Sequence, residues 1–175
     1  MIPASTIPTV ATDRLLLRAW TAKDIDPMAA INEDFRVAKW LGGVIGRAQT
    51  EARIEAWVDH WQERGFGPWA VEERATNQLV GRVGLMHHAD WTASPHDAEI
   101  GWALMPEVWN RGYATEGAGA ALTWARRRPD LRTIISITSA TNVRSRRVME
   151  KIGLAYGGTA TWRGFDQVWY TTELD

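Results

Sequence analysis

The sequence EIGWALMPEVWNRGYATE, residues 99–116, joins a strand pattern to a helix pattern through a short loop. Large apolar side chains alternate with smaller ones over residues 99–105, and Pro106 ends this run because it has no N–H for a sheet ladder. We therefore predict a strand over 99–105, after which the chain leaves the sheet.

A helix pattern begins just after Gly112. Small side chains, among them Ala118, Ala121 and Ala125, recur at helical spacing, and Glu116 stands in the first turn, where the helix dipole favours a carboxylate. Because its side chains are small, this helix can pack unusually close to a neighbouring strand.

The loop between these two elements, residues 109–115, has the properties of a diphosphate site. The N–H groups at a helix start are unpaired and carry a partial positive charge, Gly112 allows close approach, and Arg111 adds a cation. An ordinary glycine turn before a core helix is the alternative interpretation. A P-loop is not expected because no Lys-Ser or Lys-Thr follows the glycine, and Gly112, Gly117 and Gly119 do not match the dinucleotide spacing.

Four motifs carry a resemblance to a known family. The loop WNRGYATEG after EIGWAL resembles the acyl-CoA loop of the GNAT superfamily, most closely its RimJ/RimL-like branch of N-acetyltransferases. TDRLLLR at 12–18, WLGG at 40–43 and NVRSRRVMEKIGL at 142–154 resemble the same branch in the same order. One position departs from the pattern: the superfamily usually has Gln or Arg three residues before the loop glycine, where this chain has Trp109.

The rest of the chain predicts an α+β fold in three layers, α/β/α. Residues 1–11 are expected to be a loose lead-in. A helix-start signature at 21–24 predicts a helix to about residue 31. The patterns predict further helices at 32–40, 50–64 and 142–151, and strands at 15–17, 66–72, 79–86, 131–138, 159–162 and 167–172. The resemblance implies the GNAT acyl-CoA N-acyltransferase fold. Its sheet is mixed and mostly antiparallel, and two central parallel strands splay apart to admit the pantetheine arm.

Length and composition bound the possible functions. The 175 residues suit one domain over 1–175, and a net charge of -1 gives no global attraction to nucleic acid or an anionic membrane. The absence of Cys excludes disulfides, thiolate metal sites and an acyl-cysteine intermediate. No signal peptide pattern is present, and no window approaches the roughly 18 apolar residues of a membrane span. We predict a cytoplasmic protein without nucleic-acid or membrane partners.

Acetyl transfer from a thioester to an amine needs a base. An ammonium group with a pKa of about 10.4 for a lysine-like amine, or about 8 for an α-amino group, is mostly protonated at pH 7. Glu99 is the predicted base, acting directly or through a water, with His96 and Asp97 as alternatives. An ordinary charge at the edge of a strand is the other interpretation of Glu99.

The resemblance also implies residues that contact acetyl-CoA. It makes Asn142 an acyl-CoA contact and Ser145 the acid for the CoA thiolate, although the two are also a good N-cap and a first-turn residue. Arg147 matches the family's arginine, with a surface ion pair as its alternative role. Strand N–H groups near Leu104 and Met105 could pair with pantetheine and polarise the thioester. The loop supplies Arg111, Gly112, Tyr113, Ala114 and Thr115.

Two further groups of residues lie outside the regular core pattern. Glu33, Trp40 and Trp91 are predicted to line the acceptor pocket, because cationic amines favour carboxylates and aromatic faces. No metal site is expected, since the acidic and histidine side chains around the loop lack a recognised ligand spacing. These are His87, His88, Asp90, His96 and Asp97.

The predicted function is an acetyl-CoA-dependent N-acetyltransferase, acting as a monomer or homodimer. The acetyl group would pass directly, in a ternary complex, to a primary amine, either a protein N-terminal amine or a small-molecule amine. A non-catalytic acyl-CoA-binding regulatory protein of the same fold is the main alternative. A ribosome- or RNA-associated module using the arginines at 126–128 is a third.

Overall fold

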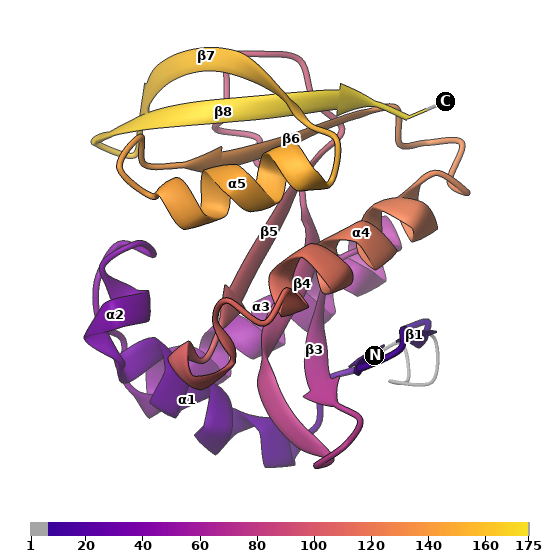
Figure 1. The fold of residues 1–175 in the computed structure, drawn as a ribbon, viewed down its shortest axis with the longest axis vertical. Coiled ribbons are helices and arrows are strands. Elements are labelled where there is room, and N and C mark those ends of the chain that lie inside the picture. Colours follow the sequence, from indigo (N-terminus) through magenta and orange to yellow (C-terminus); the bar gives the residue numbers. More distant parts are fainter. Residues whose placement is uncertain (1–6, 175) are drawn as a thin grey trace.

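The computed structural model describes residues 7–174 and places their strands in one sheet (Figure 1). The order is β1-β2-β3-β4-β5-β6-β8-β7, and neighbouring strands are antiparallel except for the central pair, β5 and β6. The strands are β1 (Val10–Ala11), β2 (Leu15–Arg18), β3 (Pro68–Glu73), β4 (Gln78–Met86), β5 (Ala98–Leu104), β6 (Thr133–Thr138), β7 (Ala155–Trp162) and β8 (Phe165–Glu173).

Helices cover both faces of the sheet, which confirms the predicted α+β class. Side chains alternate across a sheet, so Val83 and Ile100 pack in one apolar cluster with α4, whereas Ala103 packs in a second cluster with Trp57 of α3. Within the described residues, no helix has the length and apolarity to cross a bilayer. The helices are η2 (Ala22–Asp24), α1 (Ile25–Glu33), α2 (Phe35–Ala38), α3 (Arg47–Arg64), η3 (Pro106–Val108), α4 (Tyr113–Ala125) and α5 (Val143–Lys151).

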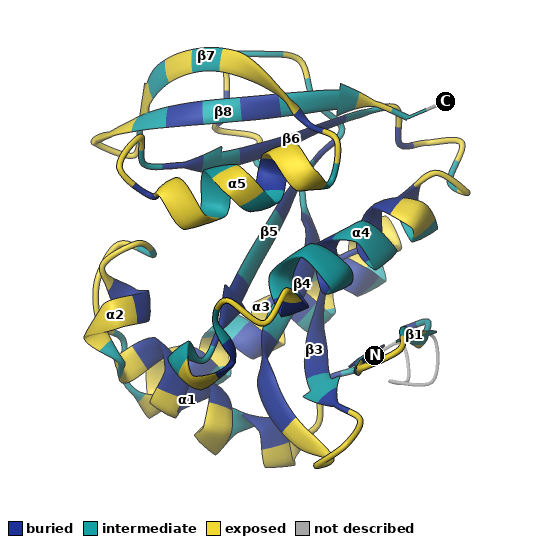
Figure 2. Cartoon of the chain, in the orientation of Figure 1, coloured by how far each residue is buried: buried dark blue, intermediate teal, exposed yellow. Residues whose placement is uncertain are grey.

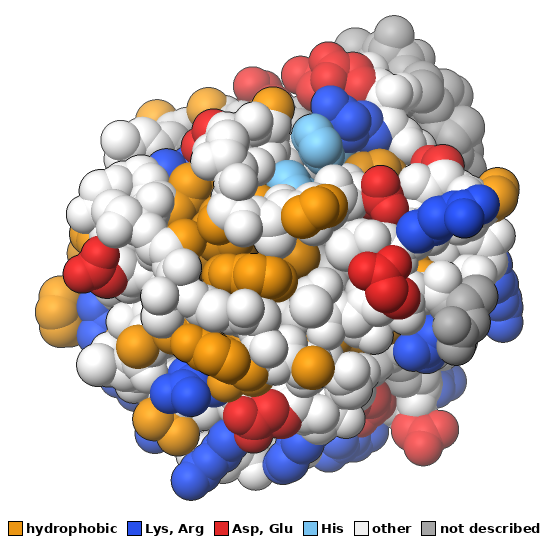
Figure 3. Space-filling model, turned by 90° about the horizontal axis from the view of Figure 1, so that it is seen from above, with side chains coloured by type: hydrophobic (Ala, Val, Ile, Leu, Met, Phe, Trp, Pro, Cys, Tyr) orange, Lys and Arg blue, Asp and Glu red, His pale blue; other side chains and the backbone are white. Residues whose placement is uncertain are grey.

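Burial follows this layering. Figure 2 shows mostly buried residues along β3 and β4 and exposed residues on the outer side of α5. Figure 3 looks onto the β7–β8 end, where hydrophobic side chains gather at the middle of the face. Tyr156 of β7 and Phe165 of β8 are among the exposed large apolar residues. The core therefore lies between the sheet and its helices.

The predicted helix over 32–40 is wrong. Asp34 adopts an extended backbone, and its carboxylate accepts a hydrogen bond from the Arg36 N–H. It therefore ends α1 at Glu33 and caps a new short helix, α2, which covers only Phe35–Ala38. The next helix, α3, begins at Arg47 rather than Thr50.

The ends of the sheet also extend beyond their predicted limits. Val10–Ala11 pairs with β2, although a loose lead-in was expected there, and residues 1–6 lie outside the described part of the chain. β7 and β8 meet at a two-residue turn, Arg163 and Gly164, both with positive φ. A two-residue turn of this kind matches the right-handed twist of the two strands, so their pairing continues up to Trp162 and Phe165 beside the turn. Both strands are therefore longer than predicted.

The parallel pairing at the centre of the sheet is very short. β5 and β6 pair only at Ala98↔Ile134 and Glu99↔Ile135. At the next position the buried Ser136 hydroxyl, rather than a backbone amide, donates to the Ile100 carbonyl at 2.7 Å. The two strands diverge from this point, as the resemblance implies.

Replacement of Ser136 by Ala should destabilise the protein by about 1 to 3 kcal/mol, because the buried Ile100 carbonyl loses its partner. Urea unfolding measures the effect. Ser139→Ala is the matched control, since its hydroxyl contacts only the side chain and the backbone N–H of the exposed Thr141. Equal stability of the two variants would contradict a structural role for the Ser136 bridge.

Candidate active site

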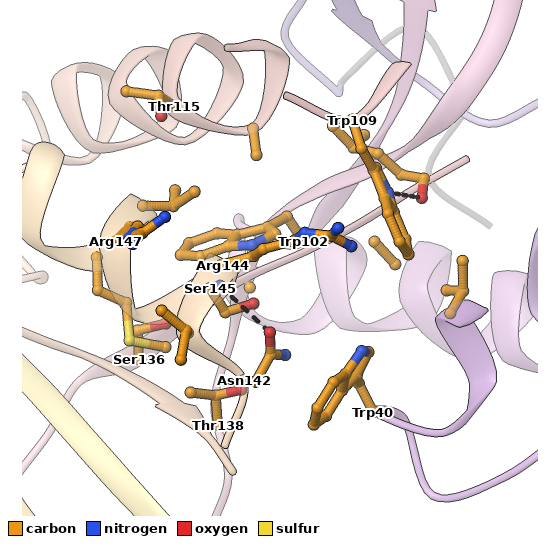
Figure 4. A pocket seen from close by; sticks show the side chains of 18 of the residues that line it. Trp40, Trp102, Trp109, Thr115, Ser136, Thr138, Asn142, Arg144, Ser145 and Arg147 are labelled. Atoms are coloured by element: carbon orange, nitrogen blue, oxygen red, sulfur yellow. Dashed lines mark hydrogen bonds between the residues drawn. The ribbon is translucent and has the colours of Figure 1, made fainter. Parts of the chain in front are cut away.

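A cleft of about 700 Å³ opens where β5 and β6 separate (Figure 4). This volume lies in the range of small-molecule sites. Its walls come from β5, β6, the loop before α4, the start of α5 and the segment after α2. Trp40, Trp102 and Trp109 all reach it, and Trp40 is one of the few large hydrophobic residues that remain exposed.

The start of α4 forms one wall of the cleft. Gly112 is its N-cap, with φ 81°, and the Gly112 carbonyl accepts the Glu116 N–H. The N–H groups of the first turn have no intrahelical partner by the geometry of a helix start. Tyr113, Ala114 and Thr115 all line the cleft with Gly112. A wall of free amides at the positive end of a helix suits an anionic group.

The turn between β1 and β2 holds this helix start in place. Thr12 Oγ1 donates to a Glu116 carboxylate oxygen at 2.6 Å, and Arg14 Nε donates to the other oxygen at 2.6 Å. Arg14 Nη1 also donates to the Arg111 carbonyl at 2.7 Å. Although burial raises the pKa of Glu116, the hydrogen bonds from Thr12 and Arg14 outweigh it and hold this pKa below its ordinary value. The TDRLLLR motif thus braces the loop.

Arg111 does not face the cleft, which corrects the prediction that it supplies the loop cation. Its guanidinium donates to Glu73 at 3.2 Å and to the Tyr113 hydroxyl at 2.9 Å. Hydrogen bonds from Tyr113, Thr76 and Arg111 hold the pKa of Glu73 below its ordinary value, so a carboxylate already satisfies this arginine. The sequence could not reveal this pairing, because Glu73 is distant in the chain.

Two other arginines, both on α5, line the cleft instead. Arg144 lies over the Trp109 ring, 5.0 Å from its centroid, and Arg147 was predicted from the resemblance. Trp109 also donates its indole N–H to the Leu104 carbonyl at 2.8 Å. The residue that departs from the family pattern therefore connects the loop to β5, and Arg144 and Trp109 are additions that sequence reasoning missed.

The backbone of β5 presents free amides to the cleft. The Met105 N–H donates to the Val80 carbonyl of β4 at 2.8 Å, so the prediction that this amide is available is wrong. Successive residues of an antiparallel strand turn their backbone groups to opposite edges. The N–H groups of Leu104 and Trp102 therefore face the separated β6 side, where the described residues provide no strand partner.

The start of α5 closes the cleft from the other side (Figure 4). The Asn142 side-chain oxygen accepts the Ser145 N–H at 3.3 Å, which makes Asn142 the N-cap of the helix. Asn142, Ser145 and Arg147 all line the cleft, as predicted for ligand contacts. Within residues 7–174, no ion pair involves Arg147, so its surface-pair alternative is not seen.

Glu99 lies in the cleft and contacts a histidine. Its carboxylate is 3.0 Å from His88 Nε2, and both side chains are largely buried, with exposed fractions of 15% and 13%. The His88 ring packs edge-on against Trp162 from β7, at 4.9 Å between centroids. A carboxylate held in this way can accept a proton from a group in the cleft.

The two alternative bases lie elsewhere. The Asp97 carboxylate accepts the backbone N–H groups of Arg132 and Thr133 at 2.7 and 2.8 Å, so it anchors the start of β6. His96 stacks on His87 and does not line the cleft; burial lowers the pKa of its imidazole. Neither His96 nor Asp97 lines the cleft, so the prediction of either one as an alternative base is wrong.

Only one of the three predicted acceptor residues reaches the cleft. Trp40 lines it, with Lys39 Nζ 4.8 Å from the ring centroid. Trp91 is buried, donates to Ser94 and packs against Trp162, which corrects its assignment as a pocket residue. Glu33 is also corrected: it lies near Gly46 at the start of α3 and is not part of the cleft wall.

Two other features of the sequence were considered as sites: the acidic and histidine side chains as metal ligands, and the arginines at 126–128 as a nucleic-acid patch. Among residues 7–174, no three acidic or histidine side chains converge as a metal site would require. Arg128, from the arginine run, donates to the carbonyls of Gly65 and Arg64 and pairs with Asp130 at 2.6 Å. This arginine therefore closes the end of α3.

Comparison with known proteins agrees with this geometry. Residues 14–155 match the family model described as an acetyltransferase (GNAT) domain, and the chain belongs to this family of acetyltransferases. A relative from Bacillus subtilis, the uncharacterized N-acetyltransferase YnaD, is 31% identical over 150 residues, which cover 85% of this chain and 84% of the relative. The chain is therefore an acyltransferase, as predicted.

Solved structures extend the comparison. An acetyltransferase from Agrobacterium tumefaciens superimposes with a TM-score of 0.82 at 27% identity, covering 95% of this chain and 94% of that one. A RimL ribosomal-protein acetyltransferase in complex with coenzyme A has a TM-score of 0.78 at 17% identity, covering 96% of this chain and 99% of that one. At that identity the likeness concerns the fold alone. The predicted GNAT fold is confirmed.

Acetyl-CoA is the substrate that GNAT acetyltransferases use, and the cleft has groups that fit it. The α4 amides and the α5 arginines suit phosphates, while the free β5 amides suit the amide-rich pantetheine arm.

We expect Arg14→Ala to raise the dissociation constant of CoA about three- to tenfold, because the loop loses the partly exposed ion pair between Arg14 and Glu116.

Isothermal titration with CoA measures this loss. Arg47→Ala is the control, since Arg47 forms comparable exposed pairs with Asp26 and Glu51 on the far helices. Unaltered CoA affinity in Arg14→Ala, with Arg47→Ala also unaltered, would show that the loop keeps its shape without the Arg14 side chain.

Proposed function

We propose that this acetyltransferase moves the acetyl group of acetyl-CoA directly to a primary amine in a ternary complex. The observation that carries the proposal is the position of Glu99. It stands in the same cleft as the free amides of β5 and the start of α4, at the point where the sheet opens. A base and an acyl donor site thus share one cavity, which favours an enzyme over a CoA-binding regulator.

The cleft can take its two ligands from opposite faces of the sheet. Trp102 and Leu104 belong to the face that packs on α4, whereas Glu99 and Gly101 belong to the face toward α3, because side chains alternate along β5. The acyl donor would enter beside α4 and α5. The acceptor would approach from the face toward α3, beside Trp40.

Each residue has a defined part in the proposed transfer. The amides of Gly112 to Thr115 bind the diphosphate, and Asn142 and Arg147 contact the donor. The Leu104 N–H donates to the thioester carbonyl and stabilises the negative charge that develops on its oxygen. As the amine nitrogen bonds to the acetyl carbon and the carbon–sulfur bond breaks, the Ser145 hydroxyl donates to the departing sulfur.

Glu99 would take the proton that the amine must lose. An ammonium group is mostly protonated near neutral pH, so a carboxylate at the point of attack removes a barrier of several kcal/mol. His88, 3.0 Å from the carboxylate, holds it in position. The acceptor is a protein N-terminal amine or a small-molecule amine.

Replacement of Glu99 by Gln keeps the shape of the side chain but removes its basicity. Turnover at pH 7 should fall by roughly 100- to 10,000-fold, while acetyl-CoA binding is retained. Between about pH 9 and 10 the gap should narrow, because more of the amine is then neutral without a base. Release of free CoA thiol over a panel of amines and peptides measures turnover.

A variant with parental turnover at pH 7 would make Glu99 a structural residue. Loss of acetyl-CoA binding together with turnover would indicate misfolding instead. If the parent binds acetyl-CoA by titration but acetylates no amine or peptide in the panel, the proposed enzymatic function fails.

A further inference from the structure

The floor of the cleft holds a second charged residue, Arg82 of β4, close to Glu99. The register pairs Arg82 with Ala103, Gly84 with Gly101 and Met86 with Glu99, so Arg82 and Glu99 share a face of the sheet. A Cβ added at Gly101 would lie 3.5 Å from both Glu99 carboxylate oxygens and 3.7 Å from Arg82 Nη1. A small ligand lying on Gly101 can therefore touch both charges.

Arg82 has no polar partner among the described residues. Glu99 pairs with His88, and no carboxylate of residues 7–174 lies within ion-pair distance of the Arg82 guanidinium. Its guanidinium instead lies over the Trp57 ring, 5.2 Å from the ring centroid. By contrast, the half-buried Arg18 pairs with both Asp24 and Glu72, at 2.8 Å in each case.

Such an arginine is costly without a counter-ion, since partial burial removes water from a charged group. Burial lowers the pKa of Arg82 to about 10; the charge of Glu99 acts against this shift, and the positive charge of Arg53 adds to it. Two arginines and one carboxylate leave this region with an excess of positive charge. A carboxylate on a ligand would supply the missing partner, because its two oxygens match the guanidinium fork.

We infer that the acceptor is a small amine that also carries a carboxylate, with its ammonium group toward Glu99 and its carboxylate on Arg82. The inference rests on the proposed acetyl transfer and specifies its acceptor. The spacing across Gly101 requires the two charges of the acceptor to be only a few bonds apart, as in a free amino acid. Trp40, which lines the cleft, bounds the remainder of the acceptor.

Matched acceptors test the carboxylate directly. Free amino acids and their carboxamides are compared as acceptors of the parent and of Arg82→Gln. The variant should lose about 10- to 100-fold in kcat/KM for the acids, since one charge-assisted bidentate contact is removed, and little for the amides. Comparison of parent with variant cancels the difference in amine pKa between acid and amide.

Two further variants separate recognition from folding. Arg82→Lys should recover part of the activity toward the acids, because it keeps the charge but not the fork. Arg47→Gln, which removes an exposed arginine of α3, should alter neither acceptor class. Equal losses for acids and amides in Arg82→Gln, or better parental turnover of amides or of peptides with uncharged first residues, would overturn the inference.

A binding measurement keeps the test independent of turnover. With CoA present, N-acetyl amino acids should raise the melting temperature of the parent and not of Arg82→Gln, whereas N-acetyl amino acid amides should leave both unchanged. Absence of this difference overturns the carboxylate site even if the protein acetylates other amines. Its presence without any turnover would uphold the carboxylate site while the proposed transfer fails.

Discussion

The parallel pairing of β5 with β6 lasts for two residue pairs, and the function of the molecule depends on this brief contact. Strands that stayed paired would satisfy their own amides and leave no space between them. At the next position the Ser136 hydroxyl, instead of a backbone amide of β6, donates a hydrogen bond to the Ile100 carbonyl. Beyond this point the Trp102 and Leu104 amides have no strand partner among the described residues. The cleft with Glu99 at its floor follows from this one interruption of the sheet.

Long-range ionic contacts then fix the parts that surround the opening. Arg14 and Thr12 from the turn between β1 and β2 hold Glu116 at the start of α4, and the Glu73 carboxylate binds Arg111 and Tyr113. These contacts join segments some 40 to 100 residues apart in the chain. The glycine loop is therefore braced from outside the cleft, which leaves its amides free to bind.

The sequence predicted the elements whose signals are local. Alternation marked β5, small residues at helical spacing marked α4, and Asn142 acted as the N-cap that its position suggested. Local signals failed at Met105 and Trp91. The Met105 amide is used by a neighbouring strand, and Trp91 is covered by Trp162, so in both cases the partner comes from another part of the chain.

By itself, the sequence determined the α+β class, the order of the motifs and the placement of Glu99, Asn142 and Ser145 near the glycine loop before α4, because these depend on periodicity, capping and a resemblance along the chain. Only the tertiary structure decided which charges meet. Arg111 turns to Glu73, Arg144 lies over Trp109, and Arg82 remains beside Glu99. Ion pairs and desolvation depend on distances between side chains, which strand register and helix packing set.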